Sequence, residues 1–405
     1  MFVSDVVVSD GVLDGVDESA PAMSRRLFFR RAGLGAATTF VITDGLVAYR
    51  AYDQGVMSEG RGPAFDAWTS WRSGNGPESL VGAAILAANG HNTQPWQFAL
   101  GQNRIDLFAD LNRSTGANDP LLRELHISLG CALENLMLAS SAQGYDAAIE
   151  LDQNSTSGHV ATVTLRKGTV RIPPLYEAIG KRRSNRSEYR SLPVAASVLS
   201  TMSELVDSSV ASARLVWLLD NADRKRFGDL LVDATRAYVA DEEQSKASFL
   251  WWRSDWDSIQ KHKDGLTIDG VGLRPLVRTL GKILPSSSRQ AADKTFIDRT
   301  RIQATSAAAF GVVMVDDPSS LSARINGGRL LQRLHLWASD QGLGFQHMNQ
   351  ITERIDRDGQ LGRPSPVEQP LAELVGPGSL AAFRIGTPTV KSIRSPRRSV
   401  TEVLR

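Results

Sequence analysis

The feature that most constrains this chain is a match between two of its own segments at a constant offset of 198 residues, as between Leu133 and Leu331. The further matched pairs are Leu136 with Leu334, Leu138 with Leu336, Ser141 with Ser339, Gln143 with Gln341, and Gly144 with Gly342. Both segments place apolar residues at helical spacing, and the shared Ser-x-Gln-Gly ending makes the match more specific than that spacing alone. We therefore expect a fused duplication, and 405 residues are enough for two similar halves.

The hydrophobic pattern predicts helices and short strands in both halves. Apolar residues at helical spacing predict helices, and short β-rich runs between turn residues predict strands. Helices are expected at residues 80–88, 121–143, 175–183, 194–206 and 321–341, and strands at 96–100, 104–109, 147–151, 160–165, 214–219, 310–315 and 380–385. We expect an α+β fold in which each half holds a mixed or antiparallel sheet flanked by helices. The predicted boundaries are a leader at 1–55, a first half at 56–170 and a second half at 171–405.

Composition excludes several kinds of site. The 46 basic and 44 acidic residues give a net charge of +2, which leaves no basic surplus for nucleic acid. The single cysteine, Cys131, lies in an apolar run and cannot form an internal disulfide, so we expect a buried thiol. The six histidines show no metal-ligand spacing, and we predict no metal site.

The segment from Ser24 to Arg30 resembles a twin-arginine export signal, because the pair Arg25 and Arg26 precedes two phenylalanines and a small apolar run at 32–42. The resemblance implies export to the cell envelope, with tethering to the membrane if the segment is not cleaved. It also suggests that Met23 is the start of translation. The alternatives are a basic amphipathic helix at a disordered terminus and a cytoplasmic protein.

A polar loop follows the first apolar helix, at His91-Asn92-Thr93-Gln94-Pro95-Trp96. Its amide side chains can bond the polar edge of a ring, and Pro95 fixes the turn into the next strand. Taken with residues 83–98, the loop resembles the signature of the FMN-dependent nitroreductase family. The resemblance implies a nitroreductase-like fold in which Asn92 and Gln94 contact FMN. A loop that only caps the helix is the alternative.

Closely spaced arginines occupy residues 181–189, and arginine is suited to phosphate because its planar charged donors match phosphate oxygens. The alternative is a solvated basic turn. The segment is similar to the Arg-x-Ser-x-Arg motif of nitroreductases, which implies that Arg182, Ser184 and Arg186 contact the FMN phosphate and ribityl chain, with Arg183 beside them.

Two further segments are similar to parts of the same family. The basic pair Arg397 and Arg398 follows the last strand, where the family closes over the FMN phosphate, and a charged tail is the alternative. The segment 342–346 follows the second matched helix, where the family has backbone donors near the reactive flavin nitrogen, which implies a role for Gly344.

The order of the motifs differs from that of ordinary family members, in which the arginines precede the amide loop and two chains share each flavin. Here the loop comes first, and the arginines open the second half. We expect a single-chain pseudo-dimer with one remaining site, in which Asn92 and Gln94 face Arg182, Ser184 and Arg397. The chain would be a monomer or would pair again as a homodimer.

Three functions follow from these patterns. The first is an FMN-dependent oxidoreductase that takes electrons from NAD(P)H to an organic acceptor such as a nitroaromatic or a quinone. The second is a flavin store in which residues 251–272, rich in tryptophan, cover the site, although an aromatic core helix would explain the same residues. The third is an exported scaffold without cofactor. Because a flavin performs the redox chemistry itself, we nominate no catalytic side chain.

Overall fold

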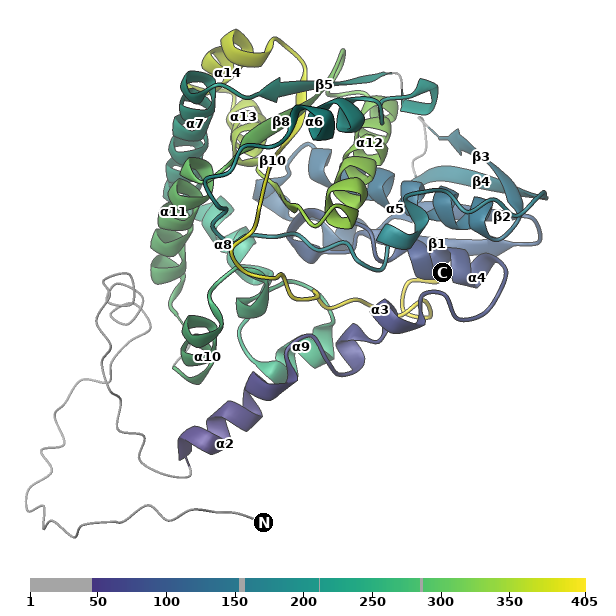
Figure 1. The fold of residues 1–405 in the computed structure, drawn as a ribbon, viewed down its shortest axis with the longest axis horizontal. Coiled ribbons are helices and arrows are strands. Elements are labelled where there is room, and N and C mark those ends of the chain that lie inside the picture. The colour runs from purple at the N-terminus through teal and green to yellow at the C-terminus, as the bar shows by residue number, and fades with distance from the viewer. Residues whose placement is uncertain (1–45, 153–156, 211, 285–286) are drawn as a thin grey trace, which may run out of the picture.

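The computed structural model describes residues 46–152, 157–210, 212–284 and 287–405, and the predicted twin-arginine segment lies outside them (Figure 1). Within these residues, no helix combines the length and the apolar character that crossing a bilayer requires. The described chain begins with three short helices, α2 (Leu46–Asp53), α3 (Ala67–Ser70) and α4 (Pro77–Ala84). Two four-stranded sheets follow, and their order along the chain corresponds to the two predicted halves.

The first sheet has the strand order β1-β2-β4-β3, and every neighbouring pair is antiparallel. Its strands are β1 (Trp96–Gly101), β2 (Arg104–Ala109), β3 (Tyr145–Leu151) and β4 (His159–Lys167). The helix α5 (Arg123–Ala142) connects β2 to β3 and packs on the sheet. The alternation of apolar residues along β1, β2 and β4 explains this packing, since one face of each strand is buried against the helices.

The second sheet repeats this arrangement with the strand order β5-β8-β10-β9, again fully antiparallel. Its strands are β5 (Ala213–Leu218), β8 (Ala309–Val315), β9 (Gly344–His347) and β10 (Ser379–Gly386). The helix α12 (Leu321–Asp340) connects its second and third strands in the chain, as α5 does in the first sheet. The predicted α+β class is therefore confirmed, and both sheets are antiparallel rather than mixed.

The second sheet differs from the first in carrying helices on its outer face. Two insertions supply these helices, one between β5 and β8 and one between β9 and β10. Their elements are α7 (Asn221–Ala240), α8 (Glu242–Leu250), β6 (Trp252–Arg253), α9 (Trp256–His262), β7 (Leu266–Thr267), α10 (Pro275–Ile283), α11 (Arg289–Thr305), α13 (Gln350–Gln360) and α14 (Glu368–Val375). Both faces of β8 are covered, so all seven of its residues are buried. This burial explains why its sequence is continuously apolar and does not alternate.

The helices α5 and α12 pack against each other at the centre of the molecule (Figure 1). A Cβ built on Gly130 would lie 2.2 Å from the carbonyl oxygen of Ile325, and a Cβ built on Gly328 would lie 2.2 Å from that of Ile127. The two contacts are reciprocal, because Gly130 and Gly328, like Ile127 and Ile325, differ by the same 198 positions as the matched residues. Glycine is required at both positions because the backbones are too close for any side chain.

Polar side chains occupy the same helix interface. The Glu134 carboxylate accepts bonds from Arg329 at 3.0 Å and from Arg333 at 2.6 Å. On the other side of the contact, the Gln332 amide donates to Asn135 at 2.8 Å and accepts from the backbone N–H of Ala88 at 3.1 Å. Gln332 of the second half therefore bonds the backbone of Ala88, which ends the segment between α4 and the polar loop.

One expectation about local structure is corrected, and one alternative is excluded. Residues 175–183 form only a short 3₁₀ helix at Tyr176–Ala178 and not a longer α-helix, whereas the helix expected at 194–206 is present as α6 (Ala196–Ser203). The C-terminal segment is not a free charged tail. It returns to the first sheet, where the N–H of Phe98 donates to the Val403 carbonyl at 2.8 Å. Residues 387–398 thus run from the second sheet to the edge of the first.

The reciprocal glycine contact predicts that one added methyl group at Gly328 lowers the free energy of unfolding strongly. Gly328→Ala should lower the free energy of unfolding by about 1–3 kcal/mol, because the new Cβ overlaps the Ile127 carbonyl. The matched control is Gly359→Ala in α13, where a Cβ meets nothing within 4 Å and helix propensity alone should stabilise the protein slightly. Chemical denaturation measures both, and equal effects of the two changes would contradict the close contact.

Candidate functional site

The polar loop between α4 and β1 has an unusual backbone. His91, Asn92 and Gln94 have φ values of 47°, 57° and 53°, in the left-handed region that residues other than glycine rarely adopt. Such conformations cost free energy and persist where the surroundings fix them, often at functional sites. The loop is fixed here by contacts of its own amide side chains.

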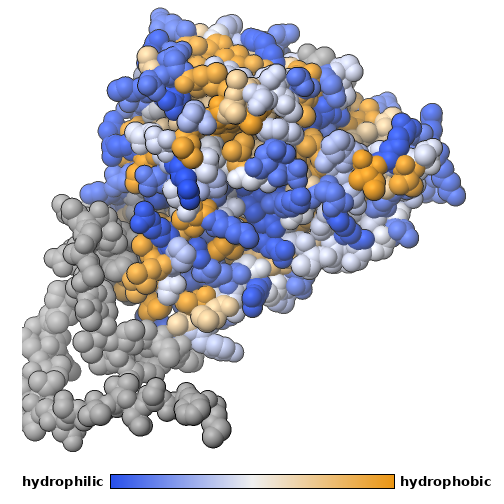
Figure 2. Space-filling view, viewed as in Figure 1, coloured by the Kyte–Doolittle hydropathy of each residue, from blue (hydrophilic) through white to orange (hydrophobic). Residues whose placement is uncertain are grey.

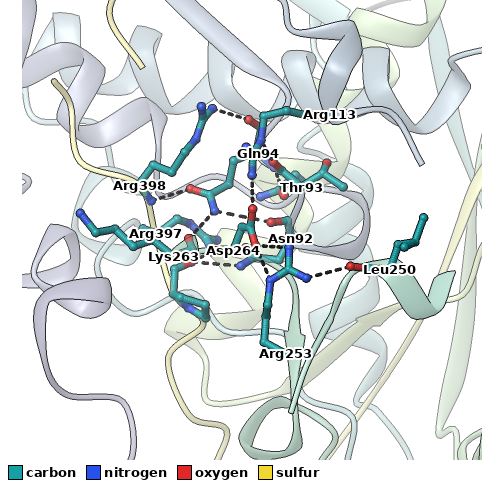
Figure 3. A network of polar contacts seen from close by, with 12 residues as sticks. Asn92, Thr93, Gln94, Arg113, Leu250, Arg253, Lys263, Asp264, Arg397 and Arg398 are labelled. Atoms are coloured by element: carbon teal, nitrogen blue, oxygen red, sulfur yellow. Dashed lines mark hydrogen bonds and ion pairs between the residues drawn. The ribbon is translucent and has the colours of Figure 1, made fainter. Parts of the chain in front are cut away.

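Both amide side chains are buried and bonded to distant parts of the chain (Figure 3). The Gln94 amide donates to the Lys263 carbonyl at 2.8 Å and accepts from the backbone N–H of Arg398 at 2.8 Å. The Asn92 amide donates to the Pro396 carbonyl at 3.0 Å, and its oxygen accepts from the guanidinium of Arg397. The structure thus brings Asn92 and Gln94 together with Arg397 and Arg398, from the opposite end of the chain.

Three of the predicted arginines surround one aromatic ring. The guanidinium carbons of Arg183, Arg397 and Arg182 lie 3.8, 5.0 and 5.8 Å from the centre of the Trp68 ring. We call these three residues and Trp68 the arginine cluster. Cation–π contact of this kind stabilises a buried guanidinium, especially where water is excluded.

The guanidinium donors of the cluster are directed at main-chain carbonyls. Arg182 donates to Leu86 at 3.2 and 3.0 Å, and Arg397 donates to Ala87 at 3.0 Å. Both carbonyls directly follow α4, where the partial negative charge of a helix end favours cations. Arg183 donates to the carbonyl of Gly180 at 3.0 Å. The cluster is therefore built at the end of the helix that leads into the polar loop.

Among the described residues, no carboxylate forms an ion pair with the three arginines of the cluster. Burial, followed by repulsion from Arg182 and Arg183, lowers the pKa of Arg397 well below its usual value. The Nε atoms of Arg397 and Arg398 are buried without a hydrogen-bond partner in the described part of the chain. By contrast, the buried Arg123 is paired with Asp356. Uncompensated buried cations are costly, so the cluster is suited to binding an anion.

Ser184 and Arg186 line a small pocket beside the cluster, and Arg186 donates to the carbonyl of Gly270 at 3.2 Å. The pocket is nearly filled, with a cavity volume of about 10 Å³, and Arg278 and Lys391 also contribute to its wall. Arg186 is near enough to the cluster to lower the pKa of Arg182 by repulsion, after the larger effect of burial.

Gly344 lies at the start of β9, where a Cβ would be 2.6 Å from the Tyr189 ring. Packing against Tyr189 therefore explains the glycine at this position. Its predicted role as a backbone donor to flavin remains a prediction.

Residues 248–272, which we call the strap, cross the loop and the small pocket. The N–H of Gly265 donates to the Asn92 carbonyl at 3.2 Å, and Ser248 contacts His91 at 3.2 Å. The Asp264 carboxylate pairs with Arg253 of the strap at 2.7 Å and with Arg113 of the first half (Figure 3). Sequence reasoning had left open an aromatic core helix at this position.

The structure contradicts the core-helix interpretation. The strap contains the last turn of α8, the two short strands, the seven-residue helix α9 and a 3₁₀ turn at Ile268–Gly270, and its three tryptophans are only half-buried. Trp256 stacks on Phe65 with ring centres 6.5 Å apart. The strap is therefore a surface covering over the loop, held by polar contacts at its ends and by aromatic contact near its middle.

Two histidines, His335 and His347, also lie near the cluster. The Arg183 carbonyl can only accept, so the Nε2 of His335, 3.1 Å away, donates to it. The Nδ1 of a neutral His335 must then accept from the Nε2 of His347 at 3.3 Å. Burial and repulsion from Arg182 lower the pKa of both rings, that of His347 to about 3. Among the described residues, no group of three or more potential ligands is placed to hold a metal ion.

No protein-family profile matches this chain. A protein of Mycobacterium tuberculosis, provisionally named as an NAD(P)H nitroreductase, is 26% identical over 200 residues, which are 48% of this chain and 55% of the relative. An uncharacterised protein of the same organism is 25% identical over 349 residues, which are 80% of this chain and 48% of the relative. The chain thus spans about half the length of the curated relatives it matches.

Solved structures with a related arrangement include provisionally named nitroreductases. One from Desulfovibrio desulfuricans, in complex with FMN, has 17% identity and a TM-score of 0.34 over 58% of this chain and 96% of its own. One from Anabaena variabilis has 11% identity and a TM-score of 0.40 over 70% of this chain and 69% of its own. At these identities and TM-scores, the solved structures do not bear on which residues form the site.

The half-buried histidine of the loop, His91, predicts a measurable dependence of stability on pH. Burial, and then repulsion from Arg186, lowers the pKa of His91 from 6.5 to about 4. The unfolded chain therefore binds a proton between these values that the folded chain does not, so stability is lost as the pH falls from 6.5 towards 4. His91→Gln should reduce this slope by at most about 1.4 kcal/mol per pH unit.

Denaturant titrations between about pH 6.5 and 4.5 measure that slope in each protein. The control is His262→Gln, because His262 is exposed on α9 and should leave the slope unchanged. A His91→Gln slope equal to that of the parent protein would contradict the burial of the ring.

Proposed function

We propose that this chain is an FMN-binding oxidoreductase of nitroreductase type, with one flavin site between its two halves. The observation that carries the proposal is the arginine cluster without carboxylates, placed directly beside the amide loop. Arg397 touches both parts, since it contacts Trp68 and donates to Asn92. The names of the M. tuberculosis relatives support the same class of reaction.

The cluster fits the phosphate end of FMN. A phosphate monoester carries up to two negative charges and three acceptor oxygens, which charged guanidinium donors match well. Arg182, Arg183 and Arg397 would hold this group, with the unpartnered Nε of Arg397 as an available donor. Ser184 and Arg186 line the adjoining pocket and would hold the ribityl chain.

The whole cofactor needs more space than the structure offers at this point. The cavity beside the cluster has a volume of about 10 Å³, whereas pockets for ligands of this size hold about 300–1,000 Å³. We infer that the strap moves outward for the cofactor to enter. Such movement would free the Gln94 amide from the Lys263 carbonyl, and a polar ring edge would take its place.

The bound flavin would supply the redox chemistry, accepting a hydride from NAD(P)H and passing electrons to an organic acceptor. The chain would bind the phosphate, orient the ring by Asn92 and Gln94, and exclude water by means of the strap. His335 and His347, kept neutral by burial beside Arg182, would keep the interior free of further positive charge.

The proposal also assigns the two halves to a pseudo-dimer within one chain. Three observations support this assignment: the equivalent strand orders, the equivalent positions of α5 and α12, and the reciprocal contacts of Gly130 and Gly328. A two-fold interface between identical partners has this property, because residue i contacts residue j and j contacts i.

A second candidate function is a flavin store, and a specific observation favours it. The strap is bonded at several points to the loop that it covers, and Lys263 is also paired with Glu402 of the C-terminal segment at 2.9 Å. A strap held this firmly would slow the approach of NAD(P)H and the release of flavin. The two candidates differ in turnover and not in cofactor.

The arginine cluster predicts how flavin binding responds to substitution. Purified protein should be yellow and should hold about one FMN per chain, measured by absorbance after release of the flavin. Arg182→Met and Arg397→Met should each weaken FMN binding by about tenfold to a hundredfold, because each removes charged donors to the phosphate. Arg190→Met is the control, since Arg190 is exposed in the same segment. Unchanged affinity in both cluster variants would refute the phosphate assignment.

The strap predicts a test that separates an enzyme from a store. Without oxygen, excess NADH or NADPH should bleach the flavin of a reductase rapidly, whereas a store should keep its colour. Asp264→Asn removes the ion pairs to Arg113 and Arg253 and should speed both bleaching and flavin release by about tenfold. Asp257→Asn, exposed on α9, is the control. Equal rates in all three proteins would mean that the strap does not limit access.

A further inference from the structure

The helix α10 is oriented with its charged side inward. The side chains of Arg278 and Lys282, one turn apart, are only 7% and 4% exposed. Ordinary surface helices bury their apolar side and expose their charges. The orientation of α10 therefore needs an explanation that burial of apolar surface does not provide.

Buried ion pairs fix this orientation. Arg278 donates to the Glu59 carboxylate at 2.8 Å, and the Lys282 ammonium lies 2.8 Å from the Asp269 carboxylate. Lys282 also donates to the carbonyl of Gly55 at 3.3 Å. Rolling the helix would leave these charges buried and unpaired, which is strongly unfavourable. The opposite side of α10 must therefore face outward.

That outward side is apolar and is continued by neighbouring residues. At 100° per residue, Leu276, Leu280 and Ile283 lie opposite Arg278 and Lys282, and we call these three, together with Tyr52 and Met57, the α10 face. Leu276 is 70% exposed, and Tyr52 in the adjoining helix α2 and Met57 in the 3₁₀ turn at Val56–Ser58 are each 84% exposed. Figure 2 shows apolar residues gathered at the lower left of the molecule, the side on which Figure 1 shows α2 and α10.

The chain just before α2 indicates what this face contacts. Residues 32–42 are small and apolar, and they end shortly before α2 begins at Leu46. Residues 23–50 contain five arginines and one aspartate, a net charge of +4. Arg274, exposed at the start of α10, adds a further positive charge beside Leu276. Apolar residues bordered by arginines are the combination that binds anionic lipid surfaces.

We propose that the α10 face binds the surface of an anionic phospholipid bilayer. The buried ion pairs of Arg278 and Lys282 hold the face rigid, and Leu276, Tyr52 and Met57 enter the boundary between headgroups and acyl chains. Arg274 at the start of α10 and Arg50 in the last turn of α2 contact the lipid phosphates. This proposal is independent of flavin binding, because none of these residues belongs to the arginine cluster or to the polar loop.

A fluorescent label can test contact at the face itself. The only natural cysteine, Cys131, is buried, so Leu276→Cys in the full chain can be labelled selectively with an environment-sensitive dye. Adding vesicles of phosphatidylcholine with about 30% phosphatidylglycerol should shift the emission to the blue, and about 0.5 M salt should reduce the effect. Leu361→Cys, 44% exposed at the end of α13, is the matched control and should not respond.

A second variant tests the energetic contribution of the face. Leu276→Asp combined with Met57→Asp should lower the affinity for these vesicles at least about tenfold in flotation, without unfolding the protein, because both side chains are exposed.

Three results would overturn the proposal. In the first result, the emission of the label does not shift although the protein floats with the vesicles, which would assign binding to the N-terminal segment alone. A shift without vesicles that rises with protein concentration assigns the face to a second copy of the chain. A shift without vesicles that does not depend on concentration assigns the face to the chain's own N-terminal segment.

Discussion

The close approach of α5 and α12 is the contact on which the rest of the molecule depends. Their backbones meet at Gly130 and Gly328, and this contact sets the position of each sheet relative to the other. The same interface places Gln332 of the second half against Ala88, just before the polar loop. The loop is therefore positioned by the opposite half of the chain, and the site between the halves is a consequence of helix packing.

The buried arginines of this protein are of two kinds, which differ in whether a carboxylate neutralises the guanidinium charge. Arg123, Arg329 and Arg333 are paired with carboxylates, and they join elements of the fold. Arg182 and Arg397 donate to main-chain carbonyls, which do not neutralise the charge of either side chain. A buried charge bonded in this way still attracts an anion, since hydrogen bonds to dipoles compensate only part of the lost hydration. The second kind therefore indicates a binding function, and the first kind indicates a structural role.

Sequence reasoning identified the parts of the site better than the connections between them. The contact of Asn92 with Arg397 follows from motif order, and both residues lie where that order requires. Local patterns also predicted α5, α12 and the strands of both four-stranded sheets except β9, because hydrophobic spacing is a property of neighbouring residues. Trp68 was missed because it lies in a glycine-rich connector, and nothing local connects it with arginines more than a hundred residues away.

The strap and the inverted helix show a second limit of sequence reasoning. The backbone bonds of the strap to Asn92 and Gln94 involve carbonyl and N–H groups that every residue has, so its sequence carries no sign of them. For α10, spacing alone predicts an amphipathic helix and cannot say which side is buried. That choice depends on Glu59 and Asp269, which belong to other segments of the chain.

The reciprocal glycine contact has a consequence for inheritance. In a dimer of identical chains, every substitution appears twice, so the two sites must change together. In a single chain with two halves, a substitution at Gly130 leaves Gly328 unaltered, and each half can diverge alone. One half can then keep the amide loop while the other keeps the arginines, and the strap can evolve over one side only. Under the proposed pseudo-dimer, differences between the two halves can be inherited because both halves lie in one chain.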